Sequence, residues 1–128
     1  MNYISYEQAL LIAEAVSGVD ALVLAKTNRI YLLDSAINAP RASFGGQELY
    51  EGDFLQAAIL VSRICRNHPL PDGNKRLAWI SLLEFLFVNG FELSVDEDDA
   101  VEFMLKVAAN EIGESDIEIW IAQRASTI

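Results

Sequence analysis

Side chains that can do chemistry gather between His68 and Arg76, where the sequence is His-Pro-Leu-Pro-Asp-Gly-Asn-Lys-Arg. Residues 71–73, Pro-Asp-Gly, predict a turn, because proline fixes φ and glycine accepts positive φ. Lys75 and Arg76 then fall in the first turn of the following helix, where the helix dipole is already positive. Two cations are unfavourable there unless an anion binds beside them, and helix N-termini readily hold phosphate. The segment therefore predicts a phosphate-binding site.

His68 and Asp72 add a proton acceptor and a metal ligand to that site. His68 is the chain's only histidine, and an imidazole can take a proton from an attacking hydroxyl near neutral pH. Asp72 offers one hard carboxylate, which suits Mg²⁺ when waters and phosphate oxygens complete its shell. A base, a metal ligand and a phosphate clamp within nine residues predict phosphoryl-type transfer, whose catalysis rests mostly on positioning and electrostatics.

Each of these residues also has an ordinary structural interpretation when it is taken alone. His68 can end a helix and bond its last carbonyls, and Asp72 can be a plain turn residue. Asn74 can cap a helix, and the pair Lys75 and Arg76 can be a solvated helix end. Their combined spacing is what favours a functional site.

The elements expected to position this segment are mostly helical. Apolar periodicity and end signals predict helices over 5–17, 20–26, 30–38, 53–66, 77–89, 96–110 and 115–124. Capping boxes at Ser5–Gln8 and Ser115–Glu118, and N-caps at Asp53 and at Asp96 or Ser94, are expected to open four of them. The helix over 77–89 is apolar nearly all round, which is typical of a helix in the middle of a bundle.

One weak β signal interrupts the helical pattern. Residues 42–50 carry Gly45-Gly46, a dipeptide that suits a tight hairpin turn. We therefore predict a compact all-α domain that carries one short β-hairpin.

Composition narrows the class of protein. The chain has 128 residues, 52% hydrophobic, which is enough for a core and argues against intrinsic disorder. Nine Lys and Arg against nineteen Asp and Glu give a net charge of −10, which disfavours nucleic acid as the main partner. One cysteine excludes an internal disulfide framework. With no visible secretory signal and no apolar run long enough for a bilayer, we expect a cytoplasmic protein without membrane contact.

Charge is uneven along the chain. Residues 63–76 hold four of the nine bases, Arg63, Arg66, Lys75 and Arg76, against the single acid Asp72. In so acidic a chain, a locally positive segment is expected to attract an anion.

The segment His68–Arg76 resembles the H-x-F-x-D/E-A/G-N-K-R motif of the Doc (death-on-curing) toxins, within the Fic/Doc, or Fido, superfamily. Four further segments resemble Doc features in the usual order: Leu33–Ala36, Ala39–Arg41, Phe44–Tyr50 and Phe85–Gly90. The resemblance covers nearly the whole chain. It implies one Fido domain over residues 1–128, a helical bundle with a β-hairpin flap.

The resemblance also implies a role for each motif residue. His68 would be the general base for a target hydroxyl, and Asp72 would hold Mg²⁺. The nucleotide phosphates of ATP would be bound by Gly73, Asn74, Lys75 and Arg76. Lys75 and Arg76 would take part in catalysis, with Arg76 as the strongest clamp. The flap residues would align a target segment as an added strand; they are Phe44, Gly45, Gly46 and Gln47.

Three positions select among the activities of the superfamily. Lys75 stands where AMP-transferring Fic proteins have glycine, and Trp79 where they have a second arginine; Doc-type members share both features. In that subgroup the γ-phosphate faces the target, so the resemblance implies a kinase-like toxin that phosphorylates a Ser or Thr of elongation factor Tu and blocks translation. AMP transfer is the alternative. Leu70 replaces the usual phenylalanine, which predicts a looser loop and is the only support for a catalytically inert binding module.

An inhibitor in trans is expected as well. Many Fic proteins carry a self-inhibitory S/T-x-x-x-E-G/N helix, but the only Glu-Gly or Glu-Asn pair here is Glu51-Gly52, with Gln47 four residues before Glu51. The resemblance therefore implies a Phd-like antitoxin that folds a helix into a groove of this chain. A helical DNA-binding domain is disfavoured by charge, and no P-loop motif occurs.

Overall fold

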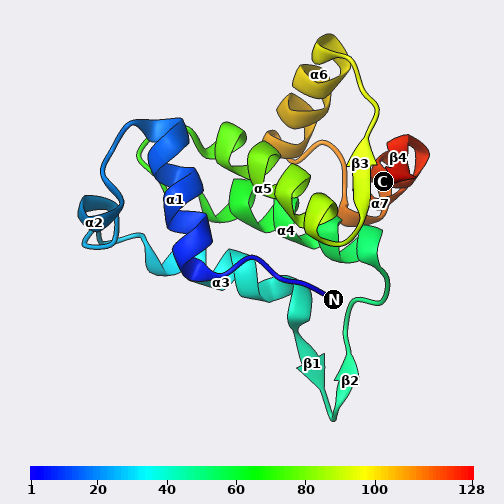
Figure 1. Ribbon diagram of the computed structural model, residues 1–128, viewed down its shortest axis with the longest axis horizontal. Coiled ribbons are helices and arrows are strands. Elements are labelled where there is room, and N and C mark those ends of the chain that lie inside the picture. The colour runs from blue at the N-terminus through cyan, green and yellow to red at the C-terminus, as the bar shows by residue number, and fades with distance from the viewer.

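Seven α-helices, one short 3-10 helix and two antiparallel strand pairs make up the computed structural model, which describes residues 1–128 (Figure 1). The helices are α1 (Tyr6–Ser17), α2 (Ala21–Leu24), α3 (Tyr31–Asn38), η1 (Ala39–Arg41), α4 (Asp53–Asn67), α5 (Asn74–Val88), α6 (Glu97–Ala108) and α7 (Glu114–Arg124). The strands are β1 (Ser43–Phe44), β2 (Gln47–Glu48), β3 (Phe91–Leu93) and β4 (Ala125–Thr127). The predicted all-α fold with a short hairpin is confirmed. None of the helices has both the length and the apolar character needed to cross a bilayer.

The helix at the centre of the bundle is α4, not the apolar helix that the sequence predicted. Helices α3, α5, α6 and α7 all pack on α4, and eight of its fifteen residues are buried. Helix α5 packs on α4 and α1 but leaves Ile80 39% and Phe87 62% exposed. Small side chains such as Ala57, Ala58 and Ser62 let neighbours approach α4 from several sides. The apolar pattern of α5 thus includes a face that the chain itself does not cover.

All the buried apolar residues except Ile59 form one connected cluster, with members from every α-helix. Leu70, in the connection between α4 and α5, belongs to it with 1% of its surface exposed. The loop that carries the chemical motif is therefore attached directly to the core.

Helix starts were predicted with mixed success. The Ser5 box is confirmed, since Gln8 N donates to Ser5 Oγ at 3.1 Å and Ser5 N donates to Gln8 Oε1 at 2.8 Å. Asp96 caps α6 by accepting from Asp99 N at 2.8 Å. The other two predictions, an N-cap at Asp53 and a capping box at Ser115–Glu118, are wrong. Gly52, with φ 95°, occupies the cap position before α4, because the chain enters from the hairpin through a conformation that favours glycine.

The second predicted capping box also fails. Helix α7 begins at Glu114, one residue before Ser115, and no side chain caps it. The Glu114 carboxylate instead meets Arg63 on α4, at 3.4 Å, so the first turn of α7 is fixed by a contact between helices.

The hairpin of β1 and β2 projects from the bundle beyond α3 (Figure 1). Ser43 pairs with Glu48 and Phe44 with Gln47. Gly45 and Gly46 join the strands with φ of 60° and 83°, as a two-residue hairpin turn requires.

A second strand pair, β3 with β4, was not predicted. Phe91 pairs with Thr127 and Leu93 with Ala125, which ties the end of the chain to the segment after α5. Ala-Ser-Thr has no alternation of apolar and polar residues, so a pairing between segments this far apart leaves no local signal.

Candidate active site

The loop between α4 and α5 is bracketed by two residues in left-handed conformation. His68 ends α4 with φ 51° and ψ 57°, and its N–H donates to Ile64 O at 3.1 Å. Gly73 precedes α5 with φ 91°. A Cβ at Gly73 would come no closer than 3.6 Å to Val16, so the backbone conformation rather than crowding favours glycine there. These two turns direct the chain out of one core helix and into the next.

Asn74 braces this loop from inside. Its side-chain Oδ1 accepts from Leu70 N at 2.9 Å, and its Nδ2 donates to Leu70 O at 2.8 Å. Asn74 is only 6% exposed, so both bonds are shielded from water.

Two expectations change because of this brace. The Asn74 side chain is occupied, so only its backbone N–H remains for a phosphate, and Gly73 rather than Asn74 takes the cap position of α5. The looser loop expected from Leu70 is not seen, because Leu70 is buried in the core and held at both its N–H and its carbonyl.

A cavity of about 420 Å³ opens on the outer side of the loop. It brings together every residue that the motif nominated for catalysis, metal binding and phosphate binding. The lining residues are Cys65, His68, Pro71, Asp72, Gly73, Asn74, Lys75, Arg76 and Ala108. The flap residues Phe44–Gln47 are not among them and lie on the projecting hairpin.

The ionisable side chains around this cavity have few partners in the rest of the chain. The His68 imidazole, the Asp72 carboxylate and the Lys75 ammonium make no hydrogen bond or ion pair within the protein. Arg76 donates one bond, from Nη1 to Val16 O at 3.2 Å, and forms no ion pair. A base, an acid and two cations thus surround one solvent-filled space.

The donor set fits a metal ion for which the protein would supply only one of the ligands. No three His, Cys, Asp or Glu side chains gather anywhere in the chain to form a complete metal cage. Asp72 is exposed and presents a single carboxylate to the cavity. Mg²⁺ commonly binds through one or two carboxylates together with substrate phosphates and waters, which matches this arrangement.

Cys65 lines the cavity and was missed by the sequence reasoning. Burial raises the pKa of its thiol from 9.0 to about 11, while the charge of Lys75 acts in the opposite direction. The thiol is therefore protonated at neutral pH and is a poor nucleophile. His68 follows Cys65 by three residues but lies beyond the predicted helix over 53–66, so the sequence carried no signal that placed both residues on one helix face.

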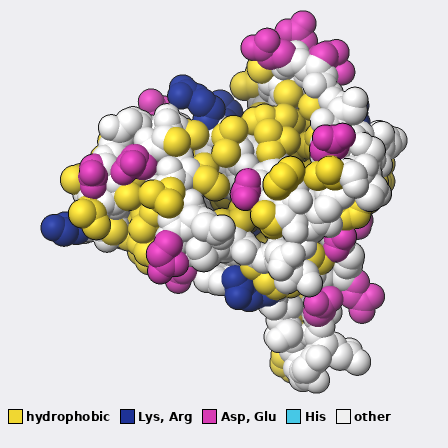
Figure 2. All heavy atoms as spheres, viewed as in Figure 1, with side chains coloured by type: hydrophobic (Ala, Val, Ile, Leu, Met, Phe, Trp, Pro, Cys, Tyr) yellow, Lys and Arg dark blue, Asp and Glu magenta, His cyan; other side chains and the backbone are white.

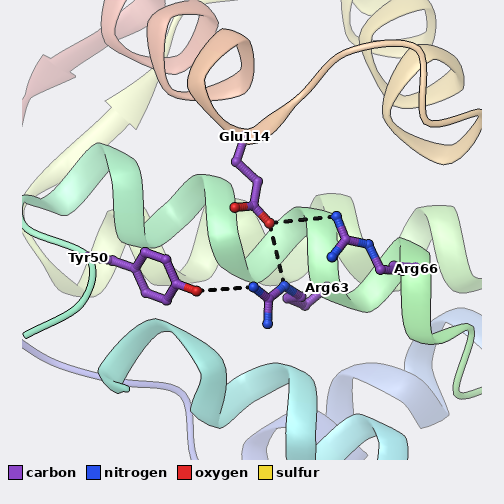
Figure 3. A network of polar contacts seen from close by, with 4 residues as sticks. All are labelled: Tyr50, Arg63, Arg66 and Glu114. Atoms are coloured by element: carbon purple, nitrogen blue, oxygen red, sulfur yellow. Dashed lines mark hydrogen bonds and ion pairs between the residues drawn. The ribbon is translucent and has the colours of Figure 1, made fainter. Parts of the chain in front are cut away.

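The four bases of segment 63–76 divide into two pairs. Arg63 Nε and Arg66 Nη2 both face Glu114 Oε1, at 3.4 Å and 3.7 Å (Figure 3). Arg63 Nη2 also donates to the Tyr50 hydroxyl at 3.1 Å, which links the base of the hairpin to α4 and α7. This pair does not line the cavity. The expectation that all four bases attract an anion is therefore wrong for Arg63 and Arg66.

An apolar area lies beside the cavity. Hydrophobic side chains gather over α5 between α1 and α6, and acidic side chains gather at the tip of α6 (Figure 2). Within this area a groove of about 250 Å³ starts at Lys75 and Arg76 and continues over Trp79, Val101 and Leu105.

Comparisons with known proteins agree on one family. The model of the Fic/DOC family matches residues 3–86, a range that includes both the hairpin and the motif loop. The protein named Toxin Doc from Mycolicibacterium smegmatis is 40% identical over 82 residues, which cover 62% of this chain. The match spans 63% of that relative's own length.

Proposed function

The chain belongs to the Fic/DOC family, and from that premise we propose that it is a Doc-type toxin that transfers the γ-phosphate of ATP to a serine or threonine hydroxyl of a translation factor. The observation that carries the proposal is the cavity itself. It gathers one imidazole, one carboxylate and two cations, and none of them is paired with another charged group. Such a set is available to a phosphorylated substrate.

His68 acts as the general base in this proposal. The oxygen of the target hydroxyl forms a bond to the γ-phosphorus, and the bond from that phosphorus to the bridging oxygen of ADP breaks. The hydroxyl proton passes to the His68 imidazole, and ADP leaves with the electron pair. The His68 backbone is held at the end of a core helix, and the imidazole has no intrachain partner, so it is available to accept the proton.

The phosphates are held by the start of α5. Its first helical hydrogen bond runs from Leu77 N to Gly73 O at 2.8 Å, so the N–H groups before Leu77 are available to phosphate oxygens. Lys75 and Arg76 add two positive charges at the same point. Asp72 would hold Mg²⁺, which when bound neutralises charge on the phosphates.

Lys75 and Trp79 favour phosphoryl transfer over AMP transfer. Trp79 packs edge-on against Phe103 and Trp120, with ring centroids 6.4 Å apart in each case. An indole in that cluster offers no charge to a phosphate chain running along α5, where AMP-transferring relatives have arginine. The inert-module alternative had only Leu70 in its support, and Leu70 packs well.

We propose that the hairpin docks the target. Phe44 is 82% exposed at its tip, and the outer edges of β1 and β2 have no further strand beside them. A target segment could add to such an edge through backbone hydrogen bonds. Elongation factor Tu is the proposed target, and the process that would be blocked is translation in the cytoplasm. The single connected core supports one Fido domain over residues 1–128.

We also propose a Phd-like antitoxin as the partner that restrains the toxin. The support is the apolar groove that begins at Lys75 and Arg76, because a helix lying along Trp79, Val101 and Leu105 would end beside the cavity. The first check is whether a neighbouring reading frame encodes a small protein of this kind.

The decisive experiment is transfer of label from ATP to purified elongation factor Tu in the presence of Mg²⁺. Label from the γ-phosphate should appear on the target, and label from the α-phosphate should not. Label from the α-phosphate would establish AMP transfer instead. His68→Ala should remove transfer and relieve growth arrest on expression in a bacterial host, whereas Lys26→Ala, which removes a charge that does not line the cavity, should change neither. Equal growth with the wild type and His68→Ala would favour an inert module.

A further inference from the structure

The backbone that carries His68 is held by a residue outside the cavity. Arg29, in the turn between α2 and α3, donates from Nη2 to Asn67 O at 2.9 Å and from Nε to His68 O at 3.3 Å. In the opposite direction, Asn67 Nδ2 donates to Leu32 O at 3.0 Å. Three hydrogen bonds therefore tie the end of α4 to the segment 29–32.

These bonds satisfy groups that a helix cannot satisfy itself. The last carbonyls of an α-helix have no partner within it, and a cation beside them also complements the negative end of the helix dipole. Arg29 meets both needs with one planar guanidinium, whose N–H groups point in fixed directions.

His68 needs such support because its backbone conformation is unusual. A φ of 51° is uncommon for any residue other than glycine. The residue after His68 is Pro69, and a residue before proline is biased toward extended backbone. Relaxation of His68 to an extended conformation would turn its side chain away from its present direction. Conformations of this kind persist only where neighbouring groups hold them.

We propose that Arg29 is a positioning residue for His68: it fixes the left-handed end of α4 so that the imidazole faces the cavity. The inference rests on the proposed function, in which His68 is the general base. Arg29 does not line the cavity and touches His68 only through its carbonyl, so it acts through His68 and not on the substrate.

One readout needs no activity. Because His68 is the chain's only histidine, the imidazole protons in an NMR spectrum report on this residue alone. In the free protein, Arg29→Ala should shift and broaden these resonances, and Arg29→Lys should give an intermediate change. Lys26→Ala removes a neighbouring exposed cation that forms no side-chain bond, so its spectrum should match that of the wild type.

The second readout separates positioning from binding. Arg29→Ala should lower kcat for phosphoryl transfer by about 10- to 100-fold, while KM for ATP stays within about 2-fold, because misplacement of a catalytic group affects the chemical step. Arg29→Lys should recover part of kcat. A parallel rise in KM for ATP, with kcat unchanged, would assign Arg29 to nucleotide binding and overturn the proposal.

The two proposals fail in different ways. If the wild type transfers no phosphate, the proposed function fails, while the imidazole resonances still decide whether Arg29 holds His68. If Arg29→Ala folds with wild-type imidazole resonances, the positioning role is wrong whatever the activity. If Arg29→Ala does not fold, Arg29→Lys decides: wild-type resonances and kcat in that folded variant would make Arg29 a residue of general stability, and altered values would support positioning.

Discussion

Two pairs of cations lie within fourteen residues of each other in the sequence and meet opposite surroundings in the structure. Arg63 and Arg66 project from α4 and share the carboxylate of Glu114, and Arg63 also donates to Tyr50 (Figure 3). Lys75 and Arg76 stand in the first turn of α5, where the dipole is positive, and no carboxylate pairs with them. The first pair connects elements, and the second pair faces a cavity.

The difference shows what local charge can and cannot indicate. A cation with a carboxylate partner has already gained most of its available electrostatic stabilisation, so an incoming anion adds little. A cation at a helix N-terminus without a partner gains when an anion arrives. Cations that the fold leaves unpaired are therefore the better candidates for an anion-binding site, and the number of bases in a sequence segment overstates the size of that site.

The largest effect is expected at Lys75 and Arg76, the two cations without a carboxylate partner. The double variant Lys75→Ala, Arg76→Ala should lower phosphoryl transfer by about 1000-fold. One preorganised charge that stabilises the transferring group typically contributes a factor of about 100 to 1000, and two charges that act on the same group contribute less than the product of their separate factors. The melting temperature should stay level or rise, since two cations leave the positive end of α5. Initial rates with labelled ATP and thermal melts of the same samples measure both quantities.

Two results would contradict this contrast between the two pairs of cations. If the double variant unfolded, or if its transfer rate stayed near that of the wild type, Lys75 and Arg76 would be structural residues or solvated ones. The matched variant Arg63→Ala, Arg66→Ala removes the same charge from the same region and should retain transfer within about 3-fold, because neither side chain lines the cavity.

The next largest effect is expected at Asn74, where a substitution distinguishes a structural role from a phosphate-binding role within the motif. Asn74→Ala removes both bonds to the buried backbone of Leu70, and the free energy of unfolding should fall by about 2–3 kcal/mol. Asn74→Asp keeps an acceptor for Leu70 N but has no donor for Leu70 O, so it should lose an intermediate amount. Chemical denaturation measures both. A stability unchanged in Asn74→Ala, with nucleotide binding lost, would return the Asn74 side chain to the phosphate site.

Much of the fold could be predicted because its signals are local. The capping box at Ser5, the cap at Asp96 and the Gly45-Gly46 turn each involve residues a few positions apart, and the structure contains all three. The pairing of β3 with β4 depends on segments distant in the chain, so nothing local indicated it. The apolar positions over 54–66 were compatible with a central helix, but the choice of α4 over α5 depends on how α3, α6 and α7 pack.

The candidate site was likewise predictable where its signals are local and not where they depend on the fold. The motif from His68 to Arg76 is contiguous, and the cavity gathers the residues that its spacing nominated. The contribution of Cys65, the inward turn of Asn74 and the support from Arg29 depend on which way side chains point after folding. Spacing predicts which residues meet, and packing decides which of their atoms remain available.

A smaller effect is expected at the paired cations. Arg63→Ala should lower the free energy of unfolding by about 1 kcal/mol, because a partly buried ion pair and one hydrogen bond to Tyr50 are lost. In a double-mutant cycle with Glu114→Gln, the coupling energy should be about 0.5–1 kcal/mol. A coupling energy near zero, measured by denaturation, would mean that Glu114 does not hold Arg63 in solution.

The smallest effect is expected at Cys65, whose thiol can report separately on a cation of the cavity pair and on a cation of the pair that faces Glu114. Burial raises its pKa to about 11, so its thiolate at neutral pH is about 100-fold scarcer than that of a thiol whose pKa is 9.0. Alkylation of Cys65 should be slow to the same degree.

The same thiol predicts a pH dependence of stability. Between pH 9 and about 11 the unfolded chain loses a proton that the folded chain keeps, so stability should decline as pH rises through that window. Because the charge of Lys75 lowers this pKa, Lys75→Ala should move the midpoint of the alkylation profile upward, whereas Arg66→Ala, whose cation faces Glu114, should leave it in place. Equal shifts in both variants would mean that the thiol senses net charge and not the unpaired cation of the cavity.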